Sequence, residues 1–133
     1  FHDSCQCPIS IFVLKIGNPH AVALRTHYAQ HSFISYVAIY IGKGKAGLFD
    51  VGNEMENVAF YGGDYGIYTT KSSPGWPVMM VDSYFEGQRM AALRCQESGL
   101  AMVNLYARMF RLYLILTLII VTNCSWRTAI LKM

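Results

Sequence analysis

The sequence predicts an all-β chain that forms a partial right-handed, single-stranded parallel β-helix of about three to four coils, followed by an atypical hydrophobic C-terminal segment. Two observations predict this fold. Short runs of alternating apolar residues recur, each followed by glycine or a polar turn and then by a second short apolar run. The apolar fraction is 53% against 14% charged residues, with 9 Tyr and 7 Phe, which favours buried β structure over disorder.

The repeat is clearest between Ser32 and Leu105. Ile39, Phe60 and Phe85 lie in three successive apolar runs and are separated by two similar steps. Both steps fall within the range expected for one coil of a β-solenoid or for a leucine-rich repeat. Because the apolar residues follow period two and the L-x-x-L-x-L-x-x-N signature is missing, we expect parallel strands stacked about 4.8 Å apart.

Each predicted coil consists of a first strand, a sharp turn and a shorter second strand. Gly42, Gly62 and Gly87 recur at the turn, where the backbone needs a residue that tolerates positive φ and close approach. Asn53, Asn57 and Asp64 suit the same corners, because asparagine and aspartate also tolerate this conformation. A fourth strand start follows at Leu100. The three coils run over residues 36–51, 57–69 and 82–95.

The two ends of the chain depart from the repeat. We assign residues 1–19 to an N-terminal strand and turn segment without an assigned role, 20–107 to the β-helix coils, and 108–133 to an atypical apolar tail. Three interpretations of LYLILTLIIV at 112–121 compete: a fully buried strand pair, a non-native tail, or a short membrane-seeking segment. Because recognisable coils stop early, we expect the chain to be a fragment of a longer solenoid.

Charge and cysteine content limit the partners that we expect. The net charge is only +3 and no basic face suited to a phosphate backbone stands out, so nucleic acid is not an expected partner. The four cysteines include no C-x-x-C pair, and the sequence predicts no metal site. Small buried or free thiols are favoured over a disulfide framework, because the chain is neither tiny nor rich in cysteine, and a bridge from Cys7 to Cys95 or Cys124 is left open. The oligomeric state is left open.

Three stretches carry a family resemblance: HYAQHSFI at 27–34, GLFDVGNEMENVAFYGGDYGI at 47–67, and FEGQRMAALRCQESGL at 85–100. Together they resemble the pectate-lyase superfamily, the rhamnogalacturonase and epimerase-like group of parallel β-helices. The resemblance implies a secreted, extracellular or periplasmic protein, although the sequence contains no signal-peptide pattern. It also implies a polysaccharide lyase or glycoside hydrolase acting on pectin-like or other acidic polysaccharide. The alternatives are a non-catalytic glycan-binding or structural β-helix and a small membrane-associated protein.

The catalytic candidates follow from the chemistry of polysaccharide cleavage. Glycoside hydrolysis uses two carboxyl groups, whereas a lyase needs a base and a cation that stabilises the developing anion. The candidates are Asp50, Asp64, Glu86, Arg89 and Arg94. Asp64 and Arg89 are separated by one coil, the same step as from Phe60 to Phe85, and are expected to be neighbours on adjacent coils. They would form either a carbohydrate-facing pair or a solvated surface ion pair.

Two further groups of residues suggest binding. Tyr68 and Trp76 flank a loop that contains two prolines, and they would either stack on sugar rings or pack within the protein. Asp50, Glu54 and Glu56 would either hold Ca²⁺ through oxygen ligands or form a turn rich in solvated acids. No cofactor is expected, and Ca²⁺ is the only ion that the sequence brings into consideration.

Overall fold

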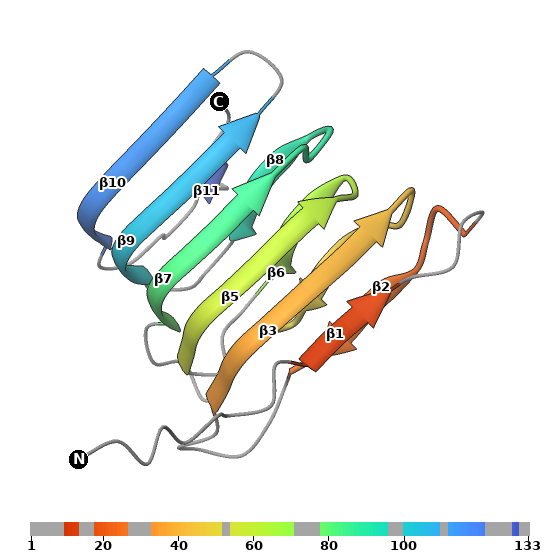
Figure 1. Cartoon of the computed structure of the whole chain (residues 1–133), viewed down its shortest axis with the longest axis horizontal. Coiled ribbons are helices and arrows are strands. Elements are labelled where there is room, and N and C mark those ends of the chain that lie inside the picture. The colour runs from red at the N-terminus through yellow and green to blue at the C-terminus, as the bar shows by residue number, and fades with distance from the viewer. Residues whose placement is uncertain are drawn as a thin grey trace, which may run out of the picture.

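The strands of the chain stack into a two-sheet solenoid (Figure 1). The computed structural model describes residues 10–13, 18–26, 33–51, 54–70, 78–95, 100–109, 112–121 and 129–130, the last two ranges by their backbone alone. In Figure 1 the longer first strands form one layer, and the shorter second strands lie behind it.

Sheet A holds the first strands and has the order β1-β3-β5-β7-β9-β10. Its strands are β1 (Ser10–Val13), β3 (Phe33–Gly42), β5 (Glu54–Gly62), β7 (Val78–Glu86), β9 (Leu100–Met109) and β10 (Leu112–Val121). Sheet B holds the second strands and has the order β11-β8-β6-β4-β2. Its strands are β2 (Val22–Arg25), β4 (Ala46–Phe49), β6 (Tyr65–Thr69), β8 (Ala91–Cys95) and β11 (Ala129–Ile130).

The three predicted coils are confirmed as the strand pairs β3–β4, β5–β6 and β7–β8. Val37, Ile39 and Ile41 are buried and alternate with outward-facing residues, as the period-two pattern predicts. The parallel register pairs Ile39 with Phe60 and Phe60 with Phe85. The described residues contain strands and turns but no helix. The chain is therefore a parallel β-helix.

The parallel pairing extends beyond these three coils. β1 lies in the N-terminal segment to which the sequence assigns no role, and it pairs in parallel with β3. β2 pairs in parallel with β4, so β1 and β2 add a strand to each sheet. β9 includes the strand start predicted at Leu100 and pairs in parallel with β7. Sheet A thus contains five strands that run in one direction.

The apolar run at 112–121 interrupts the parallel repeat. It forms β10, which pairs with β9 in the antiparallel direction along almost the whole of both strands. β11 pairs with β8 in the same reversed sense. In Figure 1 β10 lies beyond β9 at the edge of the layer of first strands. In the part of the chain that the structure describes, no helix is long and apolar enough to cross a membrane.

The core lies between the two sheets and consists of stacked like residues. Phe60 and Phe85 are fully buried, and their ring centroids lie 4.7 Å apart with an interplanar angle of 10°. The opposite sheet leaves room for them with glycine: a Cβ on Gly66 would lie 2.5 Å from Cε1 of Phe85, and a Cβ on Gly47 would lie 2.7 Å from Cδ1 of Phe60. Each of these two phenylalanines therefore packs against a glycine on the sheet B strand of the preceding coil.

The predicted glycine turns are confirmed. Gly42, Gly62 and Gly87 have φ angles of 61°, 75° and 74°, in the left-handed region where a side chain is strained. They lie at the ends of the first strands, so the turn residues that follow them gather at one corner of the solenoid. This corner holds the predicted pair Asp64 and Arg89.

A second column of left-handed residues lies within β3, β5, β7 and β9 of sheet A. It consists of Tyr36, Asn57, Asp82 and Asn104, with φ angles of 54°, 52°, 50° and 53°. Asn104 Nδ2 donates a hydrogen bond to Asp82 Oδ1 at 2.9 Å. Asparagine and aspartate tolerate this conformation, whereas tyrosine does so at a cost. Asn57 was predicted at a corner between strands but lies within β5, whereas Asp64 lies in the turn before β6, as predicted. Asn53 lies outside the described residues.

Candidate functional site

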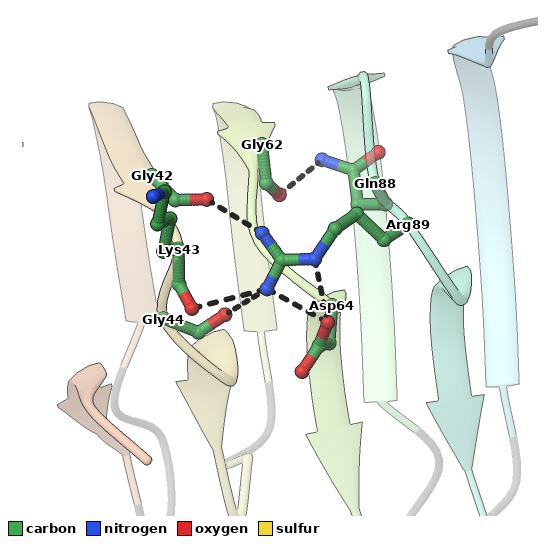
Figure 2. Close-up of polar contacts among 7 residues, drawn as sticks. All are labelled: Gly42, Lys43, Gly44, Gly62, Asp64, Gln88 and Arg89. Atoms are coloured by element: carbon green, nitrogen blue, oxygen red, sulfur yellow. Dashed lines mark hydrogen bonds and ion pairs between the residues drawn. The ribbon is translucent and has the colours of Figure 1, made fainter. Parts of the chain in front are cut away.

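Asp64 and Arg89 are neighbours, as the one-coil spacing predicts. Arg89 Nε and Nη2 both lie 2.8 Å from Asp64 Oδ1. The guanidinium also reaches one coil further, where Nη1 donates to the carbonyl of Gly42 at 3.2 Å. Nη2 donates to the carbonyls of Lys43 at 3.0 Å and Gly44 at 3.4 Å. Figure 2 shows the guanidinium between Asp64 and these three carbonyls.

This corner has the character of a structural clamp. All three guanidinium nitrogens of Arg89 already donate to protein oxygens, so the group is occupied within the fold. The adjacent Gln88 is buried, and its Nε2 donates to the carbonyls of Phe60 at 3.1 Å and Gly62 at 3.2 Å. The two side chains join the turns of three successive coils. The spacing that suggested a carbohydrate-facing pair therefore marks a surface ion pair with added backbone contacts.

The other two candidate carboxylates also have arginine partners. Asp50 Oδ2 lies 2.9 Å from Arg25 Nη2 at the end of β4. Glu86 Oε2 accepts a hydrogen bond from the Tyr84 hydroxyl at 2.6 Å, and its Oε1 lies 3.8 Å from Arg108 Nη1. Asp50, Asp64 and Glu86 are thus each held by a different arginine. This arrangement suits three separate stabilising contacts better than one acid–base pair.

Burial raises the pKa of Tyr61, and the neighbouring Tyr40 and Glu86 raise it further. The ring of Tyr61 is stacked on that of Tyr40, with centroids 4.7 Å apart. On its other side it meets the tilted ring of Tyr84 at 5.8 Å. These contacts form a row of tyrosines on the outer face of sheet A.

The carboxylates considered for Ca²⁺ lie on different sheets. Asp50 follows β4 in sheet B, whereas Glu54 and Glu56 face outward from β5 in sheet A. Among the described residues, no three His, Cys, Asp or Glu side chains form a group that could hold a metal ion. The geometry thus separates residues that lie close together in the sequence.

Cations and aromatic rings gather on the outer face of sheet B. The register places Phe49, Tyr68 and Arg94 side by side on β4, β6 and β8. The rings of Phe49 and Tyr68 are stacked at 5.5 Å, and Arg94 Cζ lies 4.2 Å from the Tyr68 centroid. Lys45 Nζ lies 4.3 Å from the same centroid, and Tyr65 meets the ring edge-on at 5.2 Å. We call Lys45, Phe49, Tyr65, Tyr68 and Arg94 the basic aromatic face.

The basic aromatic face carries two cations without acidic partners. Within the described ranges, the ion pairs are those of Arg25, Arg89 and Arg108, so neither Lys45 nor Arg94 is neutralised. Cation–π contacts hold both cations in place without removing their charge. Their N–H groups are therefore available to an anion.

Sequence reasoning identified only part of this face. It named Tyr68 as a sugar-stacking residue and Arg94 as a catalytic cation, and the structure brings the two into contact. Because Phe49 and Arg94 approach the Tyr68 ring from the strands on either side, its faces are already covered. Sequence reasoning missed Lys45, Phe49 and Tyr65, because the register of the second strands does not follow the coil step of the first strands. Trp76 lies outside the described residues.

Comparison of the chain with protein-family models, with curated proteins and with solved structures found no match. The assignment of a function therefore depends on the geometry of the chain itself and on the chemistry of its surfaces.

Proposed function

We propose that this β-helix binds an acidic, pectin-like polysaccharide on the basic aromatic face of sheet B. One observation carries the proposal: Lys45 and Arg94 both lie over the ring of Tyr68, and neither has an acidic partner among the described residues. Two fixed, unneutralised cations on a flat sheet are suited to a ligand with regularly repeated negative charges. The resemblance to the pectate-lyase superfamily supports a uronate polymer as that ligand.

The chemistry of the two cations fits carboxylates. A guanidinium can donate two parallel hydrogen bonds to one carboxylate, and an ammonium supplies a compact positive charge. Arg94 lies on β8 and Lys45 directly precedes β4, two strands away, and their charged groups lie 4.2 and 4.3 Å from the centroid of the same ring, that of Tyr68. A polymer with a carboxylate on each sugar can reach both cations at once. We therefore expect much tighter binding of the polymer than of the single sugar acid.

The contacts of the candidate catalytic residues favour binding over cleavage. Asp50, Asp64 and Glu86 are each engaged with an arginine, and Arg89 is occupied by Asp64 and turn carbonyls. Arg94 remains as a cation, but a lyase also needs a base beside it. The non-catalytic, glycan-binding alternative is therefore the function that this geometry supports best.

Affinity electrophoresis of the chain in gels containing polygalacturonate tests the proposal. We expect retardation that disappears at high salt, because screening weakens exposed charge contacts. Replacing Lys45 or Arg94 by Gln should weaken binding about tenfold. Lys43→Gln is the matched control, since it removes the same charge two residues away from Lys45 and outside the face.

Equal loss of retardation in the Lys43→Gln and Lys45→Gln variants would show that net charge alone is responsible, and would contradict the proposed face. Binding to a neutral glucan but not to polygalacturonate would contradict the acidic ligand class. If the purified chain released oligosaccharides from polygalacturonate, the proposed non-catalytic function would be wrong, and the chain would be a polysaccharide-cleaving enzyme.

A further inference from the structure

A groove with mixed apolar and acidic walls lies on the outer face of sheet A, on the opposite sheet from the basic aromatic face. Its volume is about 330 Å³, and it is lined by Phe33, Glu54, Met55, Glu56, Met79 and Val81. The register explains this set. Phe33, Glu54 and Met79 are partners on β3, β5 and β7, and the pairing of Glu56 with Val81 forms the next row.

The apolar walls of the groove are open to solvent. Phe33 is 68% exposed and Met79 is 49% exposed, on the two sides of Glu54. Most of the exposed large apolar side chains in the described residues lie on sheet A: Ile11, Val13, Phe33, Tyr36, Tyr40, Met79, Val103 and Tyr106. An extended exposed apolar surface of this kind marks an interaction site.

The acidic walls consist of two glutamates that form no ion pair with any other described residue. Glu54 and Glu56 are exposed on either side of buried Met55, so both project from the same face of β5. Their Cα atoms are about 7 Å apart along the strand. The ion pairs found in the described residues use Asp50, Asp64 and Glu86 instead. The groove therefore places two unneutralised carboxylates between exposed apolar side chains.

We propose that this groove binds an arginine or lysine side chain from a basic segment of a partner protein. The apolar stem of such a side chain would lie against Phe33 and Met79, and its charged end would reach Glu54 or Glu56. A volume near 330 Å³ is at the small end of ligand pockets and suits one long side chain. A purely apolar partner would bury the two carboxylates without compensation. Charge complementarity therefore selects a basic partner.

Fluorescence anisotropy with a labelled peptide of alternating arginine and leucine tests this proposal. The matched peptide replaces arginine by glutamate, and we expect it not to bind. Glu54→Gln should weaken binding of the arginine peptide about fivefold. Glu86→Gln is the control, because it removes the same charge from the same sheet outside the groove, and we expect less than about a twofold change.

A second variant separates groove binding from general electrostatic attraction. Met79→Ser leaves the charge unchanged and removes one apolar wall at an exposed position, so the fold should be retained. We expect it to weaken peptide binding about threefold. Unchanged affinity in this variant would overturn the proposal, as would equal losses in Glu54→Gln and Glu86→Gln.

The same variants identify the occupant. Sedimentation velocity of the chain alone measures whether it associates with itself. Concentration-dependent dimers that Glu54→Gln abolishes would make a second copy the occupant, and would overturn the proposed basic partner. A monomer that binds the arginine peptide supports it. Polygalacturonate binding by Glu54→Gln should be unchanged, since that proposal concerns sheet B.

Discussion

Arg89 and Asp64 lie one coil apart in the sequence, yet Arg89 Nη2 is 2.8 Å from Asp64 Oδ1. The guanidinium continues past Asp64 to the carbonyls of Gly42, Lys43 and Gly44 on the coil beyond. A single side chain therefore links the turns of three successive coils. This matters in a solenoid because each coil otherwise contacts only its neighbours.

Removing the clamp should destabilise the solenoid mainly through the carbonyl contacts. Exposed ion pairs contribute about 0–1 kcal/mol, so we expect Asp64→Asn to cost less than about 1 kcal/mol of unfolding free energy. Arg89→Ala should cost about 2 kcal/mol, because it also leaves turn carbonyls without a donor. Arg89→Lys should recover only a small part, since lysine lacks the planar fork. Urea unfolding measures all three, and equal costs for Asp64→Asn and Arg89→Ala would contradict the clamp.

Tyr36 occupies a position that suits asparagine. Its φ of 54° matches those of Asn57, Asp82 and Asn104 at the equivalent places of later coils. The left-handed conformation costs roughly 1–2 kcal/mol for most side chains and less for asparagine. We expect Tyr36→Asn to be about 1 kcal/mol more stable than the control Tyr36→Ala, which loses the ring but keeps the strain. Thermal unfolding compares the two, and an equally stable alanine variant would count against strain at this position.

Gly66 and Gly87 should respond differently to alanine. A Cβ on Gly66 would lie 2.5 Å from Phe85 Cε1 and 2.7 Å from the carbonyl of Ala92, so Gly66→Ala should cost about 3 kcal/mol through overpacking. A Cβ on Gly87 would meet its nearest neighbour only at 4.0 Å, but φ is +74°. Gly87→Ala should therefore cost only about 1 kcal/mol, from conformation alone. Chemical denaturation of both variants would reveal any reversal of this order.

The raised pKa of Tyr61 predicts a loss of stability in alkali. Burial, then Tyr40 and Glu86, raise this pKa above the ordinary value of 10.0. The folded chain therefore holds the Tyr61 proton more tightly than the unfolded chain does. The resulting stability is fully present below pH 10 and is lost as the pH rises through the folded-state pKa.

Tyr61→Phe should therefore reduce the decline of the unfolding free energy above pH 10. The control is Tyr106→Phe, which removes a phenol from the same sheet. Denaturant titrations between neutral pH and strongly alkaline pH give the slopes. If the unfolding free energy declined equally with pH in the wild-type chain and in Tyr61→Phe, the alkaline loss of stability could not be attributed to Tyr61.

The periodicity of the chain was predictable because it depends on spacing alone. Ile39, Phe60 and Phe85 are separated by steps of one coil. Because the strands stack in parallel, residues at equivalent positions of successive coils become neighbours. The same rule placed Asp64 beside Arg89, and the need for positive φ placed glycine at the turns. These features follow from residue order, so the first strands and the pairing of Asp64 with Arg89 could be predicted from the sequence.

The second strands were predicted, but their register did not follow from the same alignment. The step from Phe49 to Tyr68 in sheet B is shorter than the matching step from Ile39 to Phe60 in sheet A, and the step from Tyr68 to Arg94 is longer than that from Phe60 to Phe85. The turns between first and second strands differ in length from coil to coil. The basic aromatic face was therefore only partly predicted, because its register depends on how each turn closes.

The sequence by itself determined the coil repeat, the buried positions and the glycine corners, since each depends on local pattern and on a constant stacking direction. Only the tertiary structure decided the contacts made across that repeat. It carried Arg89 beyond Asp64 to a third coil, and it brought Phe33 and Met79 to the two sides of Glu54. It also reversed the direction of β10 against β9, which a run of uniformly apolar residues leaves open because either direction can satisfy its hydrogen bonds.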